Sequence, residues 1–171
     1  MINLFRFLAF IDMDLQKQHP EIPDWVLSKM QQYCAFQERC MFDVKTKLKT
    51  FHLQDDIYEQ IVIELKKKDF LNEERFAKMF ASGKLRINKW GRSKIYAAMQ
   101  QKRVPELFIL EGINSIDEDE YISVLKSVIE KKRNELNETD SFKRNKKLAK
   151  FAASKGFESN VIWRVLENLE D

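Results

Sequence analysis

Apolar residues recur along the chain at the spacing of one face of an α-helix. From about residue 21 onward they are separated by one or two helical turns, which places their side chains on one side of a helix. No stretch alternates apolar and polar residues for long enough to predict a strand. The pattern therefore predicts an all-α protein. The residues that carry it are Val26, Met30 and Tyr33, then Ile57, Ile61 and Leu65, then Phe76, Phe80 and Ile87, and finally Tyr121, Leu125 and Val128.

One set of apolar positions occurs three times. Val44, Leu48, Leu53 and Ile57 have counterparts 51 residues later, and those have counterparts a further 53 residues along. In each copy the first two positions are one helical turn apart and predict the inner face of a helix. The third position is an apolar residue in the following turn, and the fourth belongs to the next helix. The counterparts are Ile95, Met99, Val104 and Phe108, and then Leu148, Ala152, Phe157 and Val161.

A further helix is predicted before each of these pairs, because each is preceded by a capping signal with an acidic first turn. The signals are Pro23-Asp24, Asn72-Glu73-Glu74 and Asp117-Glu118-Asp119-Glu120. The predicted fold is all-α, with three tandem three-helix repeats that form an elongated, curved helical array. An ordinary helical bundle without repeats is the alternative. The predicted repeats are residues 21–71, 72–116 and 117–171, after an N-terminal extension of residues 1–20.

The amino-acid composition argues against several folds and kinds of functional site. The chain has only 4 Gly and 3 Pro in 171 residues, which argues against a many-stranded β fold and against a glycine-rich nucleotide cradle. Cys34 and Cys40 lack metal-ligand or redox spacing, so we expect reduced thiols that fill buried apolar space. His19 and His52 pair with no cysteine or acid in a metal-binding pattern. We therefore expect no metal and no cofactor.

The first eleven residues, MINLFRFLAFI, are apolar apart from Asn3 and Arg6. They have no basic region before the apolar run and no cleavage site after it, so they do not resemble a signal peptide. We favour an amphipathic lead-in helix or a poorly ordered tail over a membrane-surface anchor, and Met13 is an alternative start. Since no run of about 18 apolar residues occurs, we expect a cytoplasmic protein without a membrane partner.

Positive charge is concentrated in the middle of the chain. The net charge is only +3, but residues 72–116 hold 9 basic and 4 acidic residues, whereas each flanking segment has a net charge of −1. Residues 78–103 contain no acid, and neither do residues 142–157. Two such blocks at corresponding places suggest one continuous basic face. Its partner would be a polyanion, contacted mainly through phosphates, or an acidic protein groove; a merely solvated surface is the alternative.

Three short segments carry a family resemblance. They are DFLNEERFA (69–77), NKWGRSKI (88–95) and MQQKRV (99–104). Together they resemble the central motif of the RecX family, and the resemblance extends weakly over about residues 22–169. It implies tandem three-helix repeats and a non-catalytic protein that lies in the groove of the RecA filament on DNA. It also implies restraint of RecA ATPase and strand exchange during recombination, repair and the SOS response.

A stand-alone nucleic-acid-binding helical protein is the alternative function, and no nucleophile, base or carboxylate arrangement predicts an enzyme. We expect a monomer whose partners are the RecA filament and DNA. Candidate contact residues are Lys78, Lys84, Arg86, Lys89, Arg92, Lys94, Lys102, Arg103, Lys143, Arg144, Lys146, Lys147 and Lys150. Candidate structural residues are Phe76, Trp90, Gly91, Ile95, Met99 and Gly156.

Three positions allow more specific expectations. We expect Trp90 to be a packing anchor rather than a platform for base stacking, in a turn that it forms with Gly91. The family places Gly in the turn after the second helix, as Gly156 does, but the middle repeat has Arg103 there. A non-Gly residue in a left-handed conformation costs about 1 kcal/mol, so either this turn differs or Arg103 is tolerated there for its charge, and we favour a different turn. For Arg75, an ion pair within its helix and a partner contact both remain open.

Overall fold

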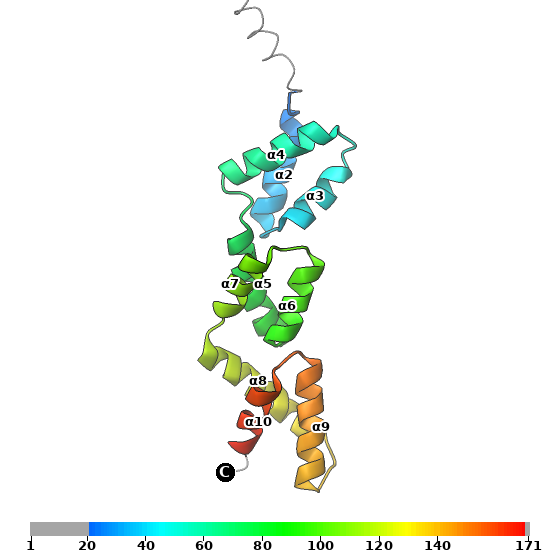
Figure 1. The fold of residues 1–171 in the computed structure, drawn as a ribbon. Coiled ribbons are helices and arrows are strands. Elements are labelled where there is room, and N and C mark those ends of the chain that lie inside the picture. Colours follow the sequence, from blue (N-terminus) through cyan, green and yellow to red (C-terminus); the bar gives the residue numbers. More distant parts are fainter. Residues whose placement is uncertain (1–20, 170–171) are drawn as a thin grey trace, which may run out of the picture. The chain divides into compact units, whose positions relative to one another are not determined.

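The computed structural model describes residues 21–169, and every regular element in that range is a helix. This confirms the all-α, repeated three-helix fold. The N-terminal extension, with its expected lead-in helix or tail, lies outside the described residues. In chain order the helices are α2 (Asp24–Phe36), α3 (Met41–Lys49), α4 (Asp55–Lys67), α5 (Glu73–Asn88), α6 (Arg92–Gln101), α7 (Glu106–Asn114), α8 (Glu118–Asn134), α9 (Ser141–Ser154) and α10 (Ser159–Glu167) (Figure 1).

The helix starts follow the capping signals. The side chain of Asn72 accepts a hydrogen bond from the Arg75 N–H at 3.0 Å, and Asp117 accepts one from the Glu120 N–H at 2.8 Å. These bonds satisfy N–H groups that have no partner inside the helix. Pro23 stands before α2 and makes no side-chain cap. The predicted starts of all three leading helices are therefore confirmed.

The described chain divides into two compact units. One contains the residues up to Gln37 together with Val44–Leu71, and the other contains Glu38–Asp43 together with the residues from Asn72 onward. The short segment joins the second unit because the Met41 N–H donates to the Glu73 carboxylate at 2.6 Å and Lys102 pairs with Asp43 at 2.7 Å. The repeat boundaries at 71/72 and 116/117 stay a prediction.

Most of the repeated positions lie in the interiors of the two units. Ile95, Met99 and their counterparts Val44, Leu48, Leu148 and Ala152 are almost fully buried. Leu53 and Phe108 are only partly buried. Phe76 is buried, whereas Phe80 is partly buried against the core.

Ile87 was predicted to be internal and is 80% exposed, so that prediction is wrong. The buried stripe of α5 runs in one-turn steps from Ala77 through Ala81 to Leu85. Ile87 lies two residues further along, which turns its side chain to the opposite side of the helix.

The turn after α6 does not differ from its counterpart after α9, which corrects the expectation from sequence. Arg103 has φ 55°, in the left-handed region where Gly156 has φ 91°. The N–H groups of Arg103 and Val104 bond to the carbonyls three and five residues earlier, as those of Gly156 and Phe157 do. The Arg103 guanidinium lies 5.6 Å from the centre of the Phe42 ring, a favourable contact that helps to offset the strain.

Candidate nucleic-acid and protein interface

The turn between α5 and α6 is built by a left-handed residue at the end of α5. Lys89 has φ 55°, its N–H bonds to the Leu85 carbonyl, and the Trp90 N–H reaches back to the Lys84 carbonyl at 3.2 Å. These two bonds close the C-terminal end of α5 around the left-handed residue and bring Trp90 against the last turn of the helix. Trp90 therefore lies beside Lys84, as expected for a turn-forming residue, and Gly91 caps α6.

Trp90 is partly buried against the core of the second unit. The ammonium nitrogens of Lys84 and Lys94 each lie 5.0 Å from the centre of its indole. Lys84 is also 5.1 Å from the Phe80 ring. Both lysines are thus held close to an aromatic surface, within the range of a cation–π contact.

The beginning of α6 is hydrogen-bonded to the turn between α9 and α10. The Gly91 N–H donates to the Lys155 carbonyl at 2.9 Å, and the Ser93 N–H donates to the Gly156 carbonyl at 3.1 Å. No side chain caps α6, so these carbonyls take that role. The turn thereby brings the two acid-free blocks of the sequence together at one point.

The meeting point of the α5–α6 turn and the α9–α10 turn is here called the junction. Arg92 makes several contacts within it. Its backbone N–H donates to the Tyr121 hydroxyl at 3.1 Å, and its guanidinium lies 4.0 Å from the centre of the Tyr121 ring. The guanidinium pairs with Glu118 at 2.7 Å and more distantly with Glu158. The pairing lowers the pKa of Glu118 below its ordinary value. Arg92 therefore links the second and third repeats and is poorly placed for a partner.

Tyr121 contributes buried hydrogen bonds to the junction. Its hydroxyl donates a hydrogen bond to Glu158, and its side chain is fully buried. Burial, followed by the Glu158 hydrogen bond, raises the pKa of Tyr121 well above its ordinary value. The hydroxyl thus stays protonated and bridges two repeats.

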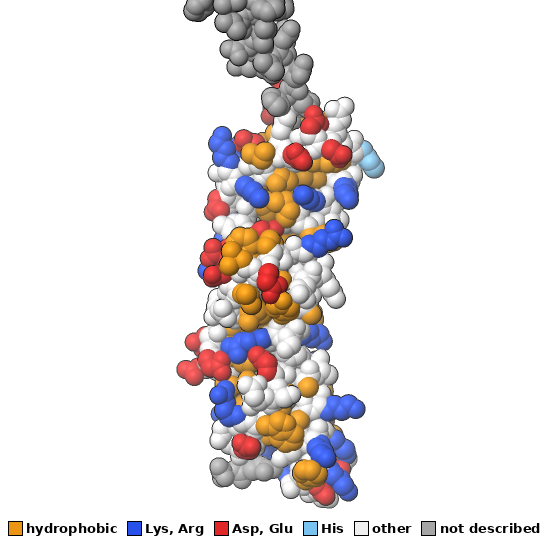
Figure 2. All heavy atoms as spheres, viewed as in Figure 1, with side chains coloured by type: hydrophobic (Ala, Val, Ile, Leu, Met, Phe, Trp, Pro, Cys, Tyr) orange, Lys and Arg blue, Asp and Glu red, His pale blue; other side chains and the backbone are white. Residues whose placement is uncertain are grey.

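Acidic side chains pair with several candidate contact residues. Arg86 forms a two-pronged pair with Glu120, at 2.6 and 2.9 Å, although 34 residues separate them. The hydrogen bond from Arg86 lowers the pKa of Glu120. The other candidates with acidic partners are Lys78 with Glu74, Lys102 with Asp43, and Lys147 with Glu138. On the face drawn in Figure 2, basic side chains lie among acidic ones and do not form an unbroken basic surface.

The remaining candidates have no carboxylate at ion-pair distance among residues 21–169. Lys84, Lys89 and Lys94 surround the turn at Trp90. Lys143, Arg144, Lys146 and Lys150 lie along α9, which begins away from that turn, and Arg103 lies at the turn after α6 (Figure 1). The structure thus gathers Lys84, Lys89 and Lys94 at one turn.

Two lysines near this place are not among the candidate contact residues from the sequence, although Lys155 belongs to the acid-free block 142–157. Lys155 bonds to Gly91 through its carbonyl, and its ammonium nitrogen lies 5.5 Å from the Phe151 ring. Lys132 approaches the same ring at 5.3 Å and also pairs with Glu135. The acid-free block and the glycine that follows Lys155 both mark Lys155 in the sequence, but nothing in the sequence marks Lys132.

Arg75 pairs with Glu38 at 2.7 Å, which is not a pair within its own helix.

Both predicted buried thiols are buried. Cys40 donates to Asp43 at 3.3 Å, and burial raises the pKa of its thiol to about 11. A thiol in this state is a poor nucleophile at neutral pH.

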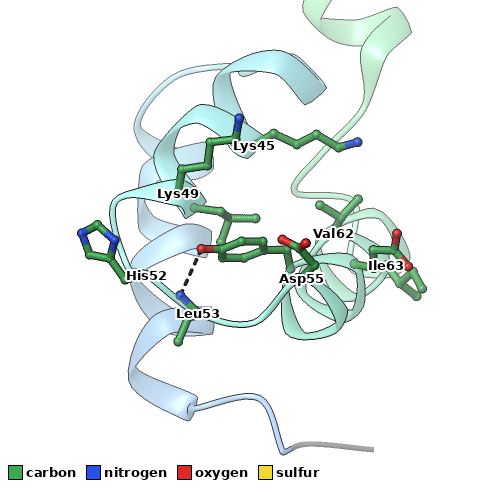
Figure 3. Close-up of a pocket in the computed structure, with 10 residues that line it drawn as sticks. Lys45, Lys49, His52, Leu53, Asp55, Val62 and Ile63 are labelled. Atoms are coloured by element: carbon green, nitrogen blue, oxygen red, sulfur yellow. Dashed lines mark hydrogen bonds between the residues drawn. The ribbon is translucent and has the colours of Figure 1, made fainter.

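A cavity of about 860 Å³ lies in the first unit, between α3 and α4 (Figure 3). Its apolar lining includes Leu48, Leu53 and Val62, and the Leu53 N–H donates to the Tyr58 hydroxyl at 3.0 Å. Lys45 and Lys49 come from α3, whereas Asp55 and Glu59 come from α4. No pattern in the sequence predicts this cavity, because helical periodicity does not report how far two helices diverge.

Comparison with known protein families shows which family this chain belongs to. Residues 72–111 match the family described as RecX, second three-helix domain, and residues 118–166 match RecX, third three-helix domain. The chain belongs to the RecX family. Both matches lie in the second structural unit, which contains the junction at Gly91.

Relatives of known name extend the match toward the first repeat. Regulatory protein RecX of Clostridium perfringens strain 13 is 32% identical over 133 residues, which are 75% of this chain and 62% of that protein. The same-named protein of Clostridium acetobutylicum is 29% identical and covers 74% of this chain and 60% of its own length. The matched stretch therefore spans about three fifths of these relatives. Their shared name denotes a regulator, in agreement with the expectation of a non-catalytic protein.

Solved structures show the same fold. The crystal structure of RecX from Lactobacillus salivarius superposes with a TM-score of 0.77 at 17% identity, covering 84% of this chain and 94% of that one. A second structure, of a regulatory protein RecX, superposes with a TM-score of 0.73 at 18% identity, covering 98% of this chain and 80% of the other. Both are similar in fold over both units.

Two further observations concern residues 21–169 only. No helix there is long and apolar enough to cross a membrane. In the same range, no three His, Cys, Asp or Glu residues are placed to hold a metal ion together.

Proposed function

We propose that this chain is a non-catalytic regulator that binds RecA filaments and DNA and restrains RecA ATPase and strand exchange during DNA repair. The observation that carries this function is the match of residues 72–111 and 118–166 to two RecX domains. The relatives that match beyond these domains are named as regulatory proteins. The proposed regulator is a cytoplasmic monomer with repeats at 21–71, 72–116 and 117–171.

The electrostatics of the junction support the DNA-binding part of this function. Lys84, Lys89 and Lys94 form no ion pair within the described chain, and they are gathered at one turn. Cations placed in this way attract a polyanion and release its condensed counterions on binding. Arg86, Arg92 and Lys102 already have acidic partners, so we assign them to holding the protein together.

The deciding experiment measures ATP hydrolysis by RecA on single-stranded DNA while the full chain is added. We expect hydrolysis to fall at protein concentrations well below those that coat the DNA. Unchanged hydrolysis would overturn the regulatory function. DNA binding together with unchanged hydrolysis would favour the alternative, a stand-alone nucleic-acid-binding protein, which the same unpaired lysines support.

A charge-reversal variant tests the assigned surface. We expect Lys84→Glu, Lys89→Glu and Lys94→Glu together to weaken both DNA binding and the effect on RecA. Lys126 is the matched control position, since it is an exposed lysine of the same unit without an aromatic ring beneath its ammonium group among the described residues. If Lys126→Glu weakens binding as much per charge, the contact surface lies elsewhere or is not localised.

A further inference from the structure

Two lysine–aromatic–lysine groups meet at the junction of the second and third repeats. The first, here called the Trp90 triad, is Lys84, Trp90 and Lys94, with both ammonium nitrogens 5.0 Å from the indole centre. The second, the Phe151 triad, is Lys132, Phe151 and Lys155, with distances of 5.3 and 5.5 Å. The Gly91–Lys155 hydrogen bond at 2.9 Å joins the segments that carry them.

We propose that Trp90 and Phe151 are lysine-positioning residues, so that this surface binds the phosphate backbone of a nucleic acid without stacking on its bases. This inference rests on the proposed function for its partner and goes beyond it in the mode of recognition. An aromatic residue among lysines is ordinarily a candidate platform for a base. The arrangement around Trp90 assigns it a different role.

The fold itself fixes the Trp90 triad. The bond from the Trp90 N–H to the Lys84 carbonyl places the indole against the last turn of α5. Lys94 lies in the first turn of α6, four residues after Trp90, and its backbone packs against Gly156, where a Cβ would approach the Lys94 Cβ to 2.4 Å. Both lysine side chains therefore start from backbone that is held by these contacts, and they converge on one ring.

The indole ring of Trp90 already contacts other groups of the protein. One side of the indole packs against the core of the unit, since Trp90 is only partly exposed. Two ammonium groups contact the π system, so a base could stack there only by displacing a lysine from its position. A phosphate instead gains from both cations without moving either, and the ordering of two flexible side chains has been completed beforehand.

The Phe151 triad has the same arrangement, but one of its two lysines is paired with an acid. Lys132 also pairs with Glu135 at 3.1 Å, whereas Lys155 has no carboxylate at ion-pair distance among residues 21–169. Lys155 is therefore the member of this triad that is available to a phosphate. Together, the surface offers Lys84, Lys94 and Lys155 from three different helical segments.

The test compares a nucleic acid with a polyanion that has no bases. Binding of labelled oligothymidylate to the full chain is measured by fluorescence anisotropy over a range of salt concentrations, and long-chain inorganic polyphosphate is added as competitor. The variants are Lys84→Gln, Lys94→Gln, Lys155→Gln, Trp90→Leu and Trp90→Phe, with Lys126→Gln as the matched control.

We expect each lysine variant to weaken binding of both polyanions by a similar factor, about 3- to 10-fold, and to lower the salt slope by about 0.7 per lost contact. Trp90→Leu should weaken both polyanions equally, and Trp90→Phe should restore binding because a ring remains. Lys126→Gln should have a clearly smaller effect on both.

Three results would overturn the inference. Trp90→Leu could weaken oligothymidylate binding while polyphosphate binding stays unchanged, which would show base stacking. Lys126→Gln could match the triad lysines, or polyphosphate could fail to compete. If circular dichroism shows that Trp90→Leu does not fold, then Trp90→Phe and the lysine variants decide, since loss of oligothymidylate binding alone in Trp90→Phe also indicates stacking.

RecA ATPase, measured in parallel with the wild-type chain, separates this inference from the proposed function. Inhibition of RecA without competition by polyphosphate overturns the phosphate-backbone surface and leaves the regulator intact. Competition by polyphosphate with the expected variant pattern, but without any effect on RecA, overturns the regulator and leaves the surface intact.

Discussion

Gly91 and Gly156 contact each other through their backbones, although Gly91 caps the start of α6 and Gly156 lies in the turn between α9 and α10. A Cβ added to Gly91 would lie 2.2 Å from the Gly156 carbonyl oxygen, and one added to Gly156 would lie 2.4 Å from the Lys94 Cβ. Atoms cannot approach this closely, so the two helical segments can meet only where neither residue has a side chain. The pair therefore sets the distance between the second and third repeats.

Substitution of either glycine should consequently destabilise the second unit. We expect Gly91→Ala and Gly156→Ala each to lower the free energy of unfolding by about 2–4 kcal/mol, because overpacking forces the backbone apart and Gly156 also has a positive φ. Urea denaturation followed by circular dichroism measures the change. Gly83→Ala is the control: a Cβ there meets nothing within 4 Å, so it should stabilise α5 by about 0.5–1 kcal/mol. Equal effects at all three positions would contradict the close contact.

The Tyr121 hydroxyl gives a second test of the junction. Tyr121→Phe removes the acceptor of the Arg92 N–H and the donor to Glu158 while the ring stays in place. We expect a loss of about 1–3 kcal/mol in unfolding free energy, because buried polar groups lose their partners. Tyr96→Phe removes an exposed hydroxyl that bonds to Glu106 and should change stability by less than about 0.5 kcal/mol. A similar loss in both variants would show that the Tyr121 bonds do not stabilise the junction.

Local features of this fold were predictable because each depends on neighbouring residues. Asn72 and Asp117 marked helix starts, since a cap needs only a side chain and an N–H three residues later. The buried pair Ile95 and Met99 followed from spacing along one helix. The Gly91 turn followed from its position between two helical patterns.

Features that depend on tertiary packing could not be predicted. The central block is free of acids in sequence, but Arg86 meets Glu120 from the next repeat, and only the fold brings them together. The left-handed Arg103 contradicts a local rule because its hydrogen bonds and Phe42 offset a modest cost. The Phe151 triad could not be predicted for the same reason, because Lys132 and Phe151 lie on different helices.

The acidic partners at the junction predict how stability changes with pH. Hydrogen bonds from Arg92 and Arg86 lower the pKa values of Glu118 and Glu120 in the folded state. A carboxyl with a lowered folded pKa stabilises the protein above its unfolded pKa, about 4.3, and that contribution is lost as the pH falls through the folded pKa. We therefore expect the urea concentration at the unfolding midpoint to decrease once the pH is lowered below about 4.5. Glu118→Gln should make the fall less steep, whereas Asp119→Asn, in the same helical turn, should change it less. An unchanged pH profile in Glu118→Gln would contradict the pairing.

Arg86 and Lys89 provide a matched pair that separates structural from partner-binding charge. They are three residues apart near the end of α5 and have the same charge, but Arg86 is held by Glu120 at 2.6 Å and Lys89 has no carboxylate at ion-pair distance in the described chain. We expect Lys89→Gln to lower the salt slope of single-stranded DNA binding by about 0.7, because one phosphate contact is lost. Arg86→Gln should leave the slope nearly unchanged and lower the urea midpoint instead, since it leaves Glu120 without its partner. Equal losses of slope would show that Arg86 leaves Glu120 to contact DNA, and the junction pairs would then be part of the binding surface.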